Sequence, residues 1–239
     1  MKIKLASGIC AAFLAAATTL AHAANPATIS DNTRYLAMGD SLTAGYGAMP
    51  ATDGYAYLLY REGAYDTLSN TTFANAAMPG ATSAQVLAYQ VPLATGTGFH
   101  PDVITMTVGG NDLLAILEGA DPQQVIVAYQ GNLVSILYGL CTALPATRIY
   151  IGNLYSIQNF PVPTEPAIQA FNQVVAGVSA FMNVAGPCGG RVKVADVYAA
   201  FSGSQQGLLL INRNGADPFQ VHPTNAGYRA MEKAFLDAR

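Results

Sequence analysis

The chain has 239 residues, of which 51% are apolar and only 10% are charged, whereas a typical soluble domain has about 25% charged residues. This composition is too apolar for an intrinsically disordered chain and suffices for a large core. The formal net charge is −3, and the basic residues form no patch that would neutralise nucleic-acid phosphates. We therefore expect a globular protein that binds no nucleic acid.

The amino-terminal residues have the pattern of a secretory signal peptide. Lys2 and Lys4 precede an apolar, alanine-rich stretch over residues 5–20. The tripeptide AHA at 21–23 matches a small-x-small cleavage site. The stretch is short for a bilayer span, which needs about 20 residues, so an uncleaved anchor helix is the less favoured alternative. We predict a leader over residues 1–23, a single domain over residues 24–239, and export to the periplasm or the medium.

Short apolar runs alternate with helical patterns along the rest of the chain. Alternation of this kind predicts a parallel sheet with helices on both faces, and nearly continuous apolar strands agree with a sheet that is covered twice. We expect an α/β fold, a three-layer α/β/α sandwich with a five-stranded parallel sheet. The strands are predicted over residues 33–39, 71–77, 102–110, 148–153 and 191–198, and the helices over residues 54–65, 82–91 (capped by Thr82 or Ser83), 122–143, 165–184 and 224–238.

Two cysteines, Cys141 and Cys188, remain after the predicted leader. In an oxidising compartment such a pair favours a disulfide, and two separate buried thiols are the alternative. The sequence has no CxxC, no HExxH and no Cys/His cluster. We therefore expect no metal and no cofactor.

Four short segments lie at predicted strand ends or before the last helix. They are GDSLTAGYG at 39–47, NAAMPGATS at 75–83, GGND at 109–112 and VHPTNAGY at 221–228. Ligands of parallel sheets bind at the carboxyl ends of the strands, so we expect these segments to converge on one site.

The segments contain the groups that acyl transfer needs. A serine hydroxyl is a poor nucleophile unless a base accepts its proton, and histidine is the usual base. The oxyanion of the intermediate needs fixed N–H donors. Ser41 and His222 provide a hydroxyl and an imidazole, Gly80 provides a backbone N–H in a tight turn, and Asn111 provides a side-chain amide.

The four segments together resemble the SGNH hydrolases, also called GDSL esterases and lipases. All four occur in the family's order, and the resemblance covers almost the whole chain after the leader. It implies a flavodoxin-like sheet, with Ser41 as the nucleophile and first oxyanion donor. It also implies that Gly80 and Asn111 are the other two oxyanion donors and that His222 is the base.

The sequence departs from the family pattern at one position. The family has an aspartate three residues before the histidine, and Phe219 stands there. We predict that Asp217, five residues before His222, orients the imidazole. Asp196, at the end of the fifth predicted strand, and a backbone carbonyl are the alternatives.

Two further aspartates have structural interpretations. We expect Asp40 to bond nearby backbone rather than to act in catalysis. We expect Asp112 to cap the helix that begins at Leu113, which leaves Asn111 available to a ligand.

The sequence as a whole predicts a monomeric, secreted or periplasmic serine esterase that acts on small-molecule or lipid esters of short or medium acyl chains. Lysophospholipase or thioesterase activity, or deacetylation of an acylated extracellular polysaccharide, are alternatives within the same chemistry. A non-catalytic binding module with the same fold is the alternative from another class.

Overall fold

A parallel five-stranded sheet forms the centre of the computed structural model, which describes residues 32–66, 70–156, 164–202 and 221–239. Its strand order is β2-β1-β3-β4-β5, so the chain reverses its direction of winding between β1 and β3. Such a switch point leaves a crevice at the carboxyl ends of the two strands. The strands are β1 (Asn32–Gly39), β2 (Asn70–Asn75), β3 (Val103–Thr107), β4 (Arg148–Gly152) and β5 (Val192–Ala195).

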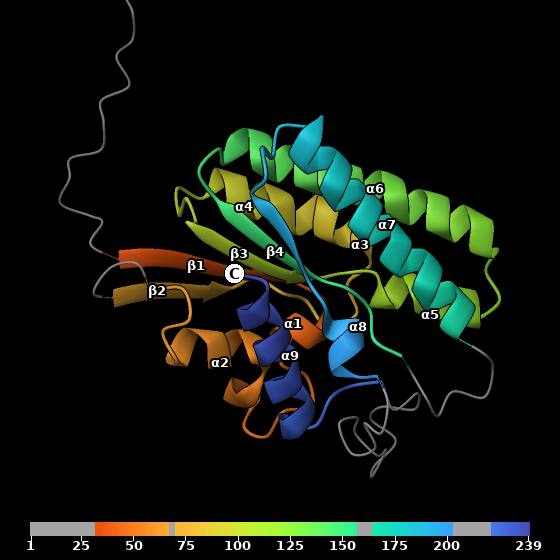
Figure 1. Cartoon of the computed structure of the whole chain (residues 1–239), viewed down its shortest axis with the longest axis horizontal. Helices are drawn as coiled ribbons and strands as arrows, with labels where there is room; N and C mark the ends of the chain where they lie inside the picture. The colour runs from red at the N-terminus through yellow and green to blue at the C-terminus, as the bar shows by residue number, and fades with distance from the viewer. Residues whose placement is uncertain (1–31, 67–69, 157–163, 203–220) are drawn as a thin grey trace, which may run out of the picture. The chain divides into compact units, whose positions relative to one another are not determined.

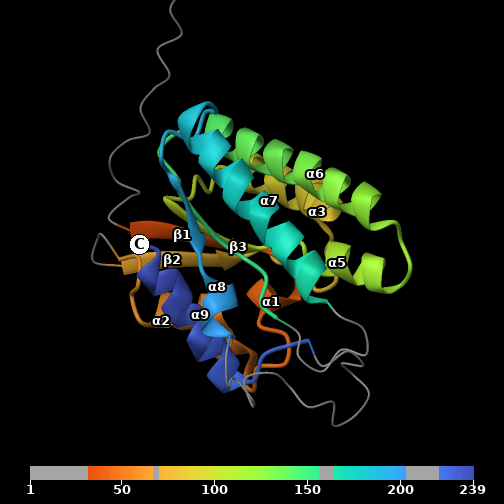
Figure 2. The same cartoon turned by 45° about the vertical axis from the view of Figure 1, so that its right-hand side comes forward.

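Helices cover both faces of the sheet (Figures 1 and 2), as the predicted three-layer sandwich requires. One layer contains α3 (Ser83–Gln85), η2 (Val86–Gln90), α4 (Val91–Gly96), α5 (Gly110–Leu117), α6 (Pro122–Ala143) and α7 (Glu165–Val184). The other contains α1 (Ser41–Ala44), η1 (Ala51–Asp53), α2 (Tyr55–Arg61), α8 (Val197–Ala200) and α9 (Asn225–Asp237). The predicted leader, residues 1–23, lies outside the described residues.

Alternating side chains of the strands fill two separate cores. In β1, Leu36 and Met38 belong to the core beneath the α6–α7 layer, whereas Tyr35 and Ala37 belong to the core beneath α2 and α9. All four are at most 5% exposed. Both faces of β1 are therefore buried, which explains why residues 35–39 form a continuous apolar run in the sequence.

The fifth strand is shorter than predicted. It was expected over residues 191–198, but β5 ends at Ala195. The Asp196 carboxylate accepts the Ala199 N–H at 3.0 Å and so caps α8. A local side-chain cap thus overrides the apolar alternation that suggests a longer strand.

The segment after β3 also differs from the prediction. β3 ends at Thr107 and α5 begins at Gly110, so Asn111 and Asp112 both lie in the first turn of the helix. The expectation that Asp112 caps this helix is wrong. Its carboxylate instead accepts the N–H of Ser83 at 2.9 Å and the hydroxyl of Ser83 at 2.6 Å.

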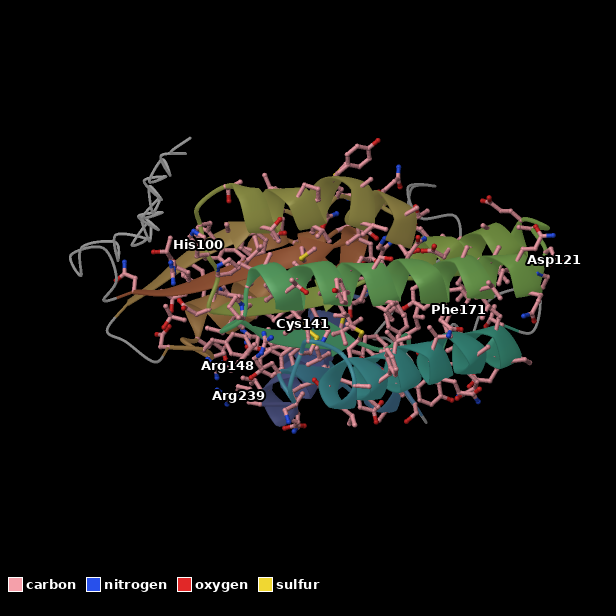
Figure 3. All side chains as sticks on the ribbon, turned by 90° about the horizontal axis from the view of Figure 1, so that it is seen from above. His100, Asp121, Cys141, Arg148, Phe171 and Arg239 are labelled. Carbon is pink, nitrogen blue, oxygen red and sulfur yellow. A yellow bond between two sulfur atoms is a disulfide. The ribbon has the colours of Figure 1, made fainter. Side chains whose placement is uncertain are left out.

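Cys141 and Cys188 form a disulfide, as the sequence suggested (Figure 3). It joins the last turn of α6 to the segment between α7 and β5, at the amino ends of the strands. Among the described residues, α6 is the one helix whose length and hydropathy would suit a membrane span. In the fold, one side of this helix is buried in the core, with Tyr129, Leu133, Ile136, Leu137 and Leu140 fully enclosed.

Candidate active site

Ser41 is the first residue of α1, directly after the carboxyl end of β1. Gly39 has φ +125°, and a Cβ there would lie 2.0 Å from the Thr107 carbonyl oxygen, so glycine is required for this close approach of β1 to β3. The Asp40 carboxylate caps α1 by accepting the Leu42 N–H at 3.0 Å. Asp40 therefore bonds nearby backbone as expected, and its neighbour Ser41 lies at the crevice.

His222 approaches Ser41 from the far end of the chain. Its Nε2 lies 2.8 Å from the Ser41 Oγ, which is hydrogen-bond distance for a nucleophile and its base. The imidazole lies against the Tyr46 ring, with the ring centroids 4.5 Å apart. The hydroxyl of the buried Tyr155 donates to the Val221 carbonyl. Tyr46 thus supports the imidazole ring, and Tyr155 holds the backbone of the residue before it.

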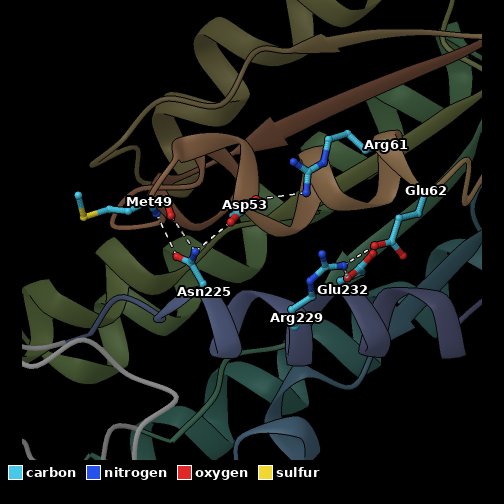
Figure 4. Close-up of polar contacts among 7 residues, drawn as sticks. All are labelled: Met49, Asp53, Arg61, Glu62, Asn225, Arg229 and Glu232. Atoms are coloured by element: carbon cyan, nitrogen blue, oxygen red, sulfur yellow. Dashed lines mark hydrogen bonds and ion pairs between the residues drawn. The ribbon is translucent and has the colours of Figure 1, made fainter.

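The start of α9 is fastened to the loop that follows α1 (Figure 4). The Asn225 amide accepts the Met49 N–H at 3.0 Å, donates to the Met49 carbonyl at 2.9 Å and donates to Asp53 at 2.9 Å. Asn225 lies three residues after His222, and Met49 lies three residues after Tyr46. The clamp therefore limits how far the histidine loop shifts relative to the ring that supports it.

Asn111 and Gly80 lie on two neighbouring segments that are joined to each other. The Asn111 Nδ2 donates to the Ala81 carbonyl at 2.9 Å. Gly80 is exposed, has φ +83°, and lies in a turn closed by a hydrogen bond from the Ala81 N–H to the Met78 carbonyl at 3.0 Å. The Met78 N–H in turn donates to the Gly39 carbonyl at 3.0 Å. The turn of Gly80 is thus attached both to Asn111 and to the strand that ends at the serine.

A pocket opens at the carboxyl ends of β1, β3 and β4. Of the predicted site residues, it brings together Ser41, Asn111 and His222, whereas Gly80 lies in the adjoining turn and does not line it. Most of the remaining wall is apolar, and α5 and the segment after β4 contribute more than half of its apolar residues. These apolar lining residues are Leu42, Val108, Leu113, Leu114, Leu154, Tyr155 and Val221.

A buried chain of hydrogen-bonded hydroxyl groups lies beneath Ser41, and the sequence does not predict it. Tyr55, Thr43 and Thr107 are linked in that order by 2.7 Å contacts between their oxygens, and the Thr107 hydroxyl donates to the Asp40 carboxylate at 2.7 Å. Burial raises the pKa of Asp40 from 3.8 to about 6, although the Thr107 hydroxyl and the Leu42 N–H lower it in part. Thr43 lies in α1 and Thr107 at the end of β3, and nothing in the sequence signals that these two threonines pair with each other.

The acid predicted to orient His222 falls outside the described residues, as does Phe219. Asp217 therefore stays a prediction. The alternative, Asp196, accepts the Ala199 N–H and also the Asn153 Nδ2 at 2.9 Å. Its carboxylate is thus already engaged at the start of α8. Among the described residues, no group of three or more His, Cys, Asp or Glu side chains is arranged to hold a metal ion.

Residues 37–230 match the GDSL-like lipase/acylhydrolase family. The chain belongs to this family. The match spans the segments of Ser41, Gly80, Asn111 and His222, and the protein is accordingly a carboxylic ester hydrolase.

Similar proteins agree with the assignment to GDSL-like hydrolases. The spore germination lipase LipC of Bacillus licheniformis is 26% identical over 209 residues, which cover 84% of this chain and 93% of LipC. The structure of the lipase Lip_vut3 from a goat rumen metagenome superposes with a TM-score of 0.69 at 26% identity, over 87% of this chain and 97% of that chain. Axe2, an acetylxylan esterase from Geobacillus stearothermophilus, shares the fold at 20% identity, with a TM-score of 0.64 over 86% of this chain and 93% of Axe2.

Proposed function

We propose that this GDSL-family hydrolase cleaves carboxylic esters through an acyl-enzyme formed on Ser41. The observation that carries the proposal is the 2.8 Å contact between the Ser41 Oγ and the His222 Nε2 at a pocket with largely aliphatic walls. In this proposal the His222 imidazole accepts the hydroxyl proton during attack and returns it to the leaving group.

The proposed reaction has two halves. In the first, the Ser41 Oγ attacks the ester carbonyl carbon while His222 takes its proton, and the alcohol then leaves with that proton. In the second, a water molecule gives a proton to His222 and attacks the acyl-enzyme, which releases the acid and restores the serine hydroxyl.

The oxyanion of each tetrahedral intermediate accepts hydrogen bonds from the N–H groups of Ser41 and Gly80 and from the Asn111 amide in this proposal. A side-chain amide has two N–H donors. One of those of Asn111 binds the Ala81 carbonyl, which fixes the plane of the amide and leaves the second for the oxyanion. We assign Asp217 as the acid that orients His222.

The pocket favours acyl chains of short or medium length as substrates. Each methylene group of an acyl chain that is buried against the apolar wall of the pocket stabilises the bound ester by about 0.8 kcal/mol. An acetyl group has only one methyl group to bury against this wall, so deacetylation of a polysaccharide is the less favoured alternative. Lysophospholipids and thioesters present the same acyl group and differ only in the leaving group. LipC and Lip_vut3, the two relatives at 26% identity, are both described as lipases.

Export of the protein is a further part of the proposal. The signal-like pattern of residues 1–23 supports it, and so does the Cys141–Cys188 disulfide, because disulfides persist in oxidising compartments. Cleavage after Ala23 would leave Ala24 as the first residue of the exported chain, which amino-terminal sequencing of that chain tests.

The catalytic proposal is tested on the purified protein with p-nitrophenyl acetate, butyrate and octanoate. We expect hydrolysis by the wild type and labelling of Ser41 by a fluorophosphonate, located by peptide mass spectrometry. Ser41→Ala should lose both. The matched control is Ser135→Ala, which removes an exposed hydroxyl that donates within α6 and should keep both. Binding of an ester without turnover, or labelling at another residue, would overturn the assignment and favour a binding module.

A further inference from the structure

We propose that Gln90 is a positioning residue whose side-chain amide holds the Gly39 peptide and thereby fixes the backbone from which Ser41 projects. The inference rests on the proposed function, because it assigns Gln90 to the same reaction. The Gly39 N–H donates to the Gln90 Oε1 at 2.6 Å, and the Gln90 Nε2 donates to the Gly39 carbonyl at 2.8 Å. Gln90 is only 2% exposed. Water therefore cannot replace either hydrogen bond without rearrangement of the core.

The need for this amide arises where β2 stops pairing with β1. The last register pair is Ala37 with Asn75. Two hydrogen bonds between the two segments continue beyond this pair. The Ala76 N–H donates to the Ala37 carbonyl at 2.8 Å, and the Met78 N–H donates to the Gly39 carbonyl at 3.0 Å. A parallel ladder continued at this register would pair the Gly39 N–H with the Ala76 carbonyl.

Gln90 takes the place of that strand carbonyl. The Asn75 Oδ1 accepts the Ala77 N–H at 3.0 Å, which closes a local turn. This turn directs the chain out of the ladder, so the Ala76 carbonyl does not reach the Gly39 N–H. The side-chain oxygen of Gln90 then receives the Gly39 N–H. Without it, a buried backbone donor would lack a partner, which would destabilise this arrangement of the Gly39 peptide.

The helix that carries Gln90 has an irregularity at this residue. The turn η2 (Val86–Gln90) is π-helical between the α-helical turns of α3 and α4. Single π turns inside α-helices are rare and frequently occur at functional sites. Here the turn ends on the one buried polar side chain of η2, with Val86 and Val91 buried beside it.

The clamp links two elements of the proposed oxyanion site. Asp40 alone separates Gly39 from Ser41, so the orientation of the Gly39 peptide constrains both the Ser41 N–H and its hydroxyl. The Gly39 carbonyl also accepts the Met78 N–H, two residues before Gly80. Gln90 thus sets the donors of Ser41 and Gly80 relative to each other. Misplacement of such groups by about 1 Å costs about 100-fold in rate.

The test removes the clamp without changing the volume of the side chain. Gln90→Met keeps the shape and loses both hydrogen bonds. We expect kcat on p-nitrophenyl butyrate to fall by about 10- to 100-fold while KM stays within about twofold. Labelling of Ser41 by the fluorophosphonate should slow by a similar factor. Gln90→Glu retains an acceptor for the Gly39 N–H and should give a smaller loss of kcat, which also keeps the proposal testable if Gln90→Met does not fold.

A matched control separates positioning from stability. Asn183 clamps one residue of β5 in the same way, accepting the Val192 N–H at 3.0 Å and donating to the Val192 carbonyl at 2.7 Å. Asn183→Leu should lower the midpoint of urea unfolding as Gln90→Met does and leave kcat unchanged. Wild-type kcat and labelling rate in a folded Gln90 variant would overturn the positioning role. Failure of the wild type itself to be labelled at Ser41 would instead overturn the proposed function.

Discussion

The Ser41 Oγ and the His222 Nε2 lie 2.8 Å apart although 181 positions separate the two residues in the sequence. The contact joins the end of the first strand to the loop before the last helix, so it forms only when both ends of the domain are in place. The amide clamp of Asn225 on Met49 and the ring of Tyr46 secure the loops on either side. A single hydrogen bond between α1 and the loop before α9 thus depends on the whole fold.

Replacement of the imidazole provides the most direct test of its role as base. His222→Gln removes the proton acceptor, and we expect kcat on p-nitrophenyl butyrate to fall by about 10⁴-fold or more. His100→Gln is the control, since His100 is exposed in the segment before β3. It should retain the wild-type kcat. Equal turnover by the wild type and His222→Gln would contradict the assignment.

The acid that orients His222 is identified by a pair of amide substitutions. Asp217→Asn keeps the shape of the side chain and removes its charge, and we expect kcat to fall by about 10⁴-fold with little change in KM. Asp196→Asn should leave kcat unchanged, because its carboxylate already holds Ala199 and Asn153. The reverse pattern would transfer the role to Asp196. Steady-state kinetics of the three proteins at one pH distinguish the outcomes.

The sequence predicts the architecture and the convergence of Ser41 and His222 for a simple physical reason. Apolar runs report burial on both faces of a strand, and the carboxyl ends of parallel strands meet at one edge. The segments that follow these runs therefore converge wherever the strand boundaries fall. Errors of a few residues, such as the end of β5 at Ala195 instead of residue 198, do not alter which segments converge.

The sequence does not predict which buried polar groups pair with one another. Gln90 lies in a helix whose periodicity says nothing of a π turn, and its partner Gly39 is 51 positions away. Asp112 precedes an apolar helical pattern and is typical of a cap, yet it binds Ser83 from another segment. Such pairings depend on three-dimensional register, which hydrophobic periodicity does not contain.

A change in the wall of the pocket should alter the acyl preference. Leu114 lines the pocket from α5, and Leu114→Phe adds volume where the chain of a longer ester would lie. We expect kcat/KM for p-nitrophenyl octanoate to fall by about 10-fold relative to that for the acetate ester. Leu117→Phe, on the same helix and outside the pocket lining, should keep the wild-type ratio. An unchanged ratio in Leu114→Phe would place the acyl chain elsewhere.

The disulfide should contribute to stability and not to turnover. Cys141 and Cys188 are separated by 47 positions, for which the chain-entropy estimate of the loss on removing the bond is about 4 kcal/mol. Both cysteines lie at the amino ends of the strands, opposite the pocket. The double variant Cys141→Ala/Cys188→Ala should therefore unfold at a lower urea concentration and retain kcat at 25 °C. A wild-type unfolding midpoint in the double variant would contradict this expectation.

The buried carboxyl of Asp40 should make stability depend on pH. Burial raises its pKa in the folded protein to about 6 from 3.8, so the fold favours the protonated form. Its contribution to stability is then fully present below about pH 4 and is lost as the pH rises through about 6. Asp40→Asn cannot ionise and keeps an oxygen that accepts from Leu42 and Thr107.

This variant should therefore gain stability relative to the wild type as the pH rises. From the size of the pKa shift, the relative gain in the free energy of unfolding between pH 4 and pH 7.5 is about 2–3 kcal/mol. Urea unfolding of both proteins at the two pH values measures this gain. Subtracting the free energy of unfolding of the wild type from that of the variant at each pH cancels the titration of all other groups. A difference between the two proteins that is the same at both pH values would show that Asp40 ionises in the fold as readily as in the unfolded chain.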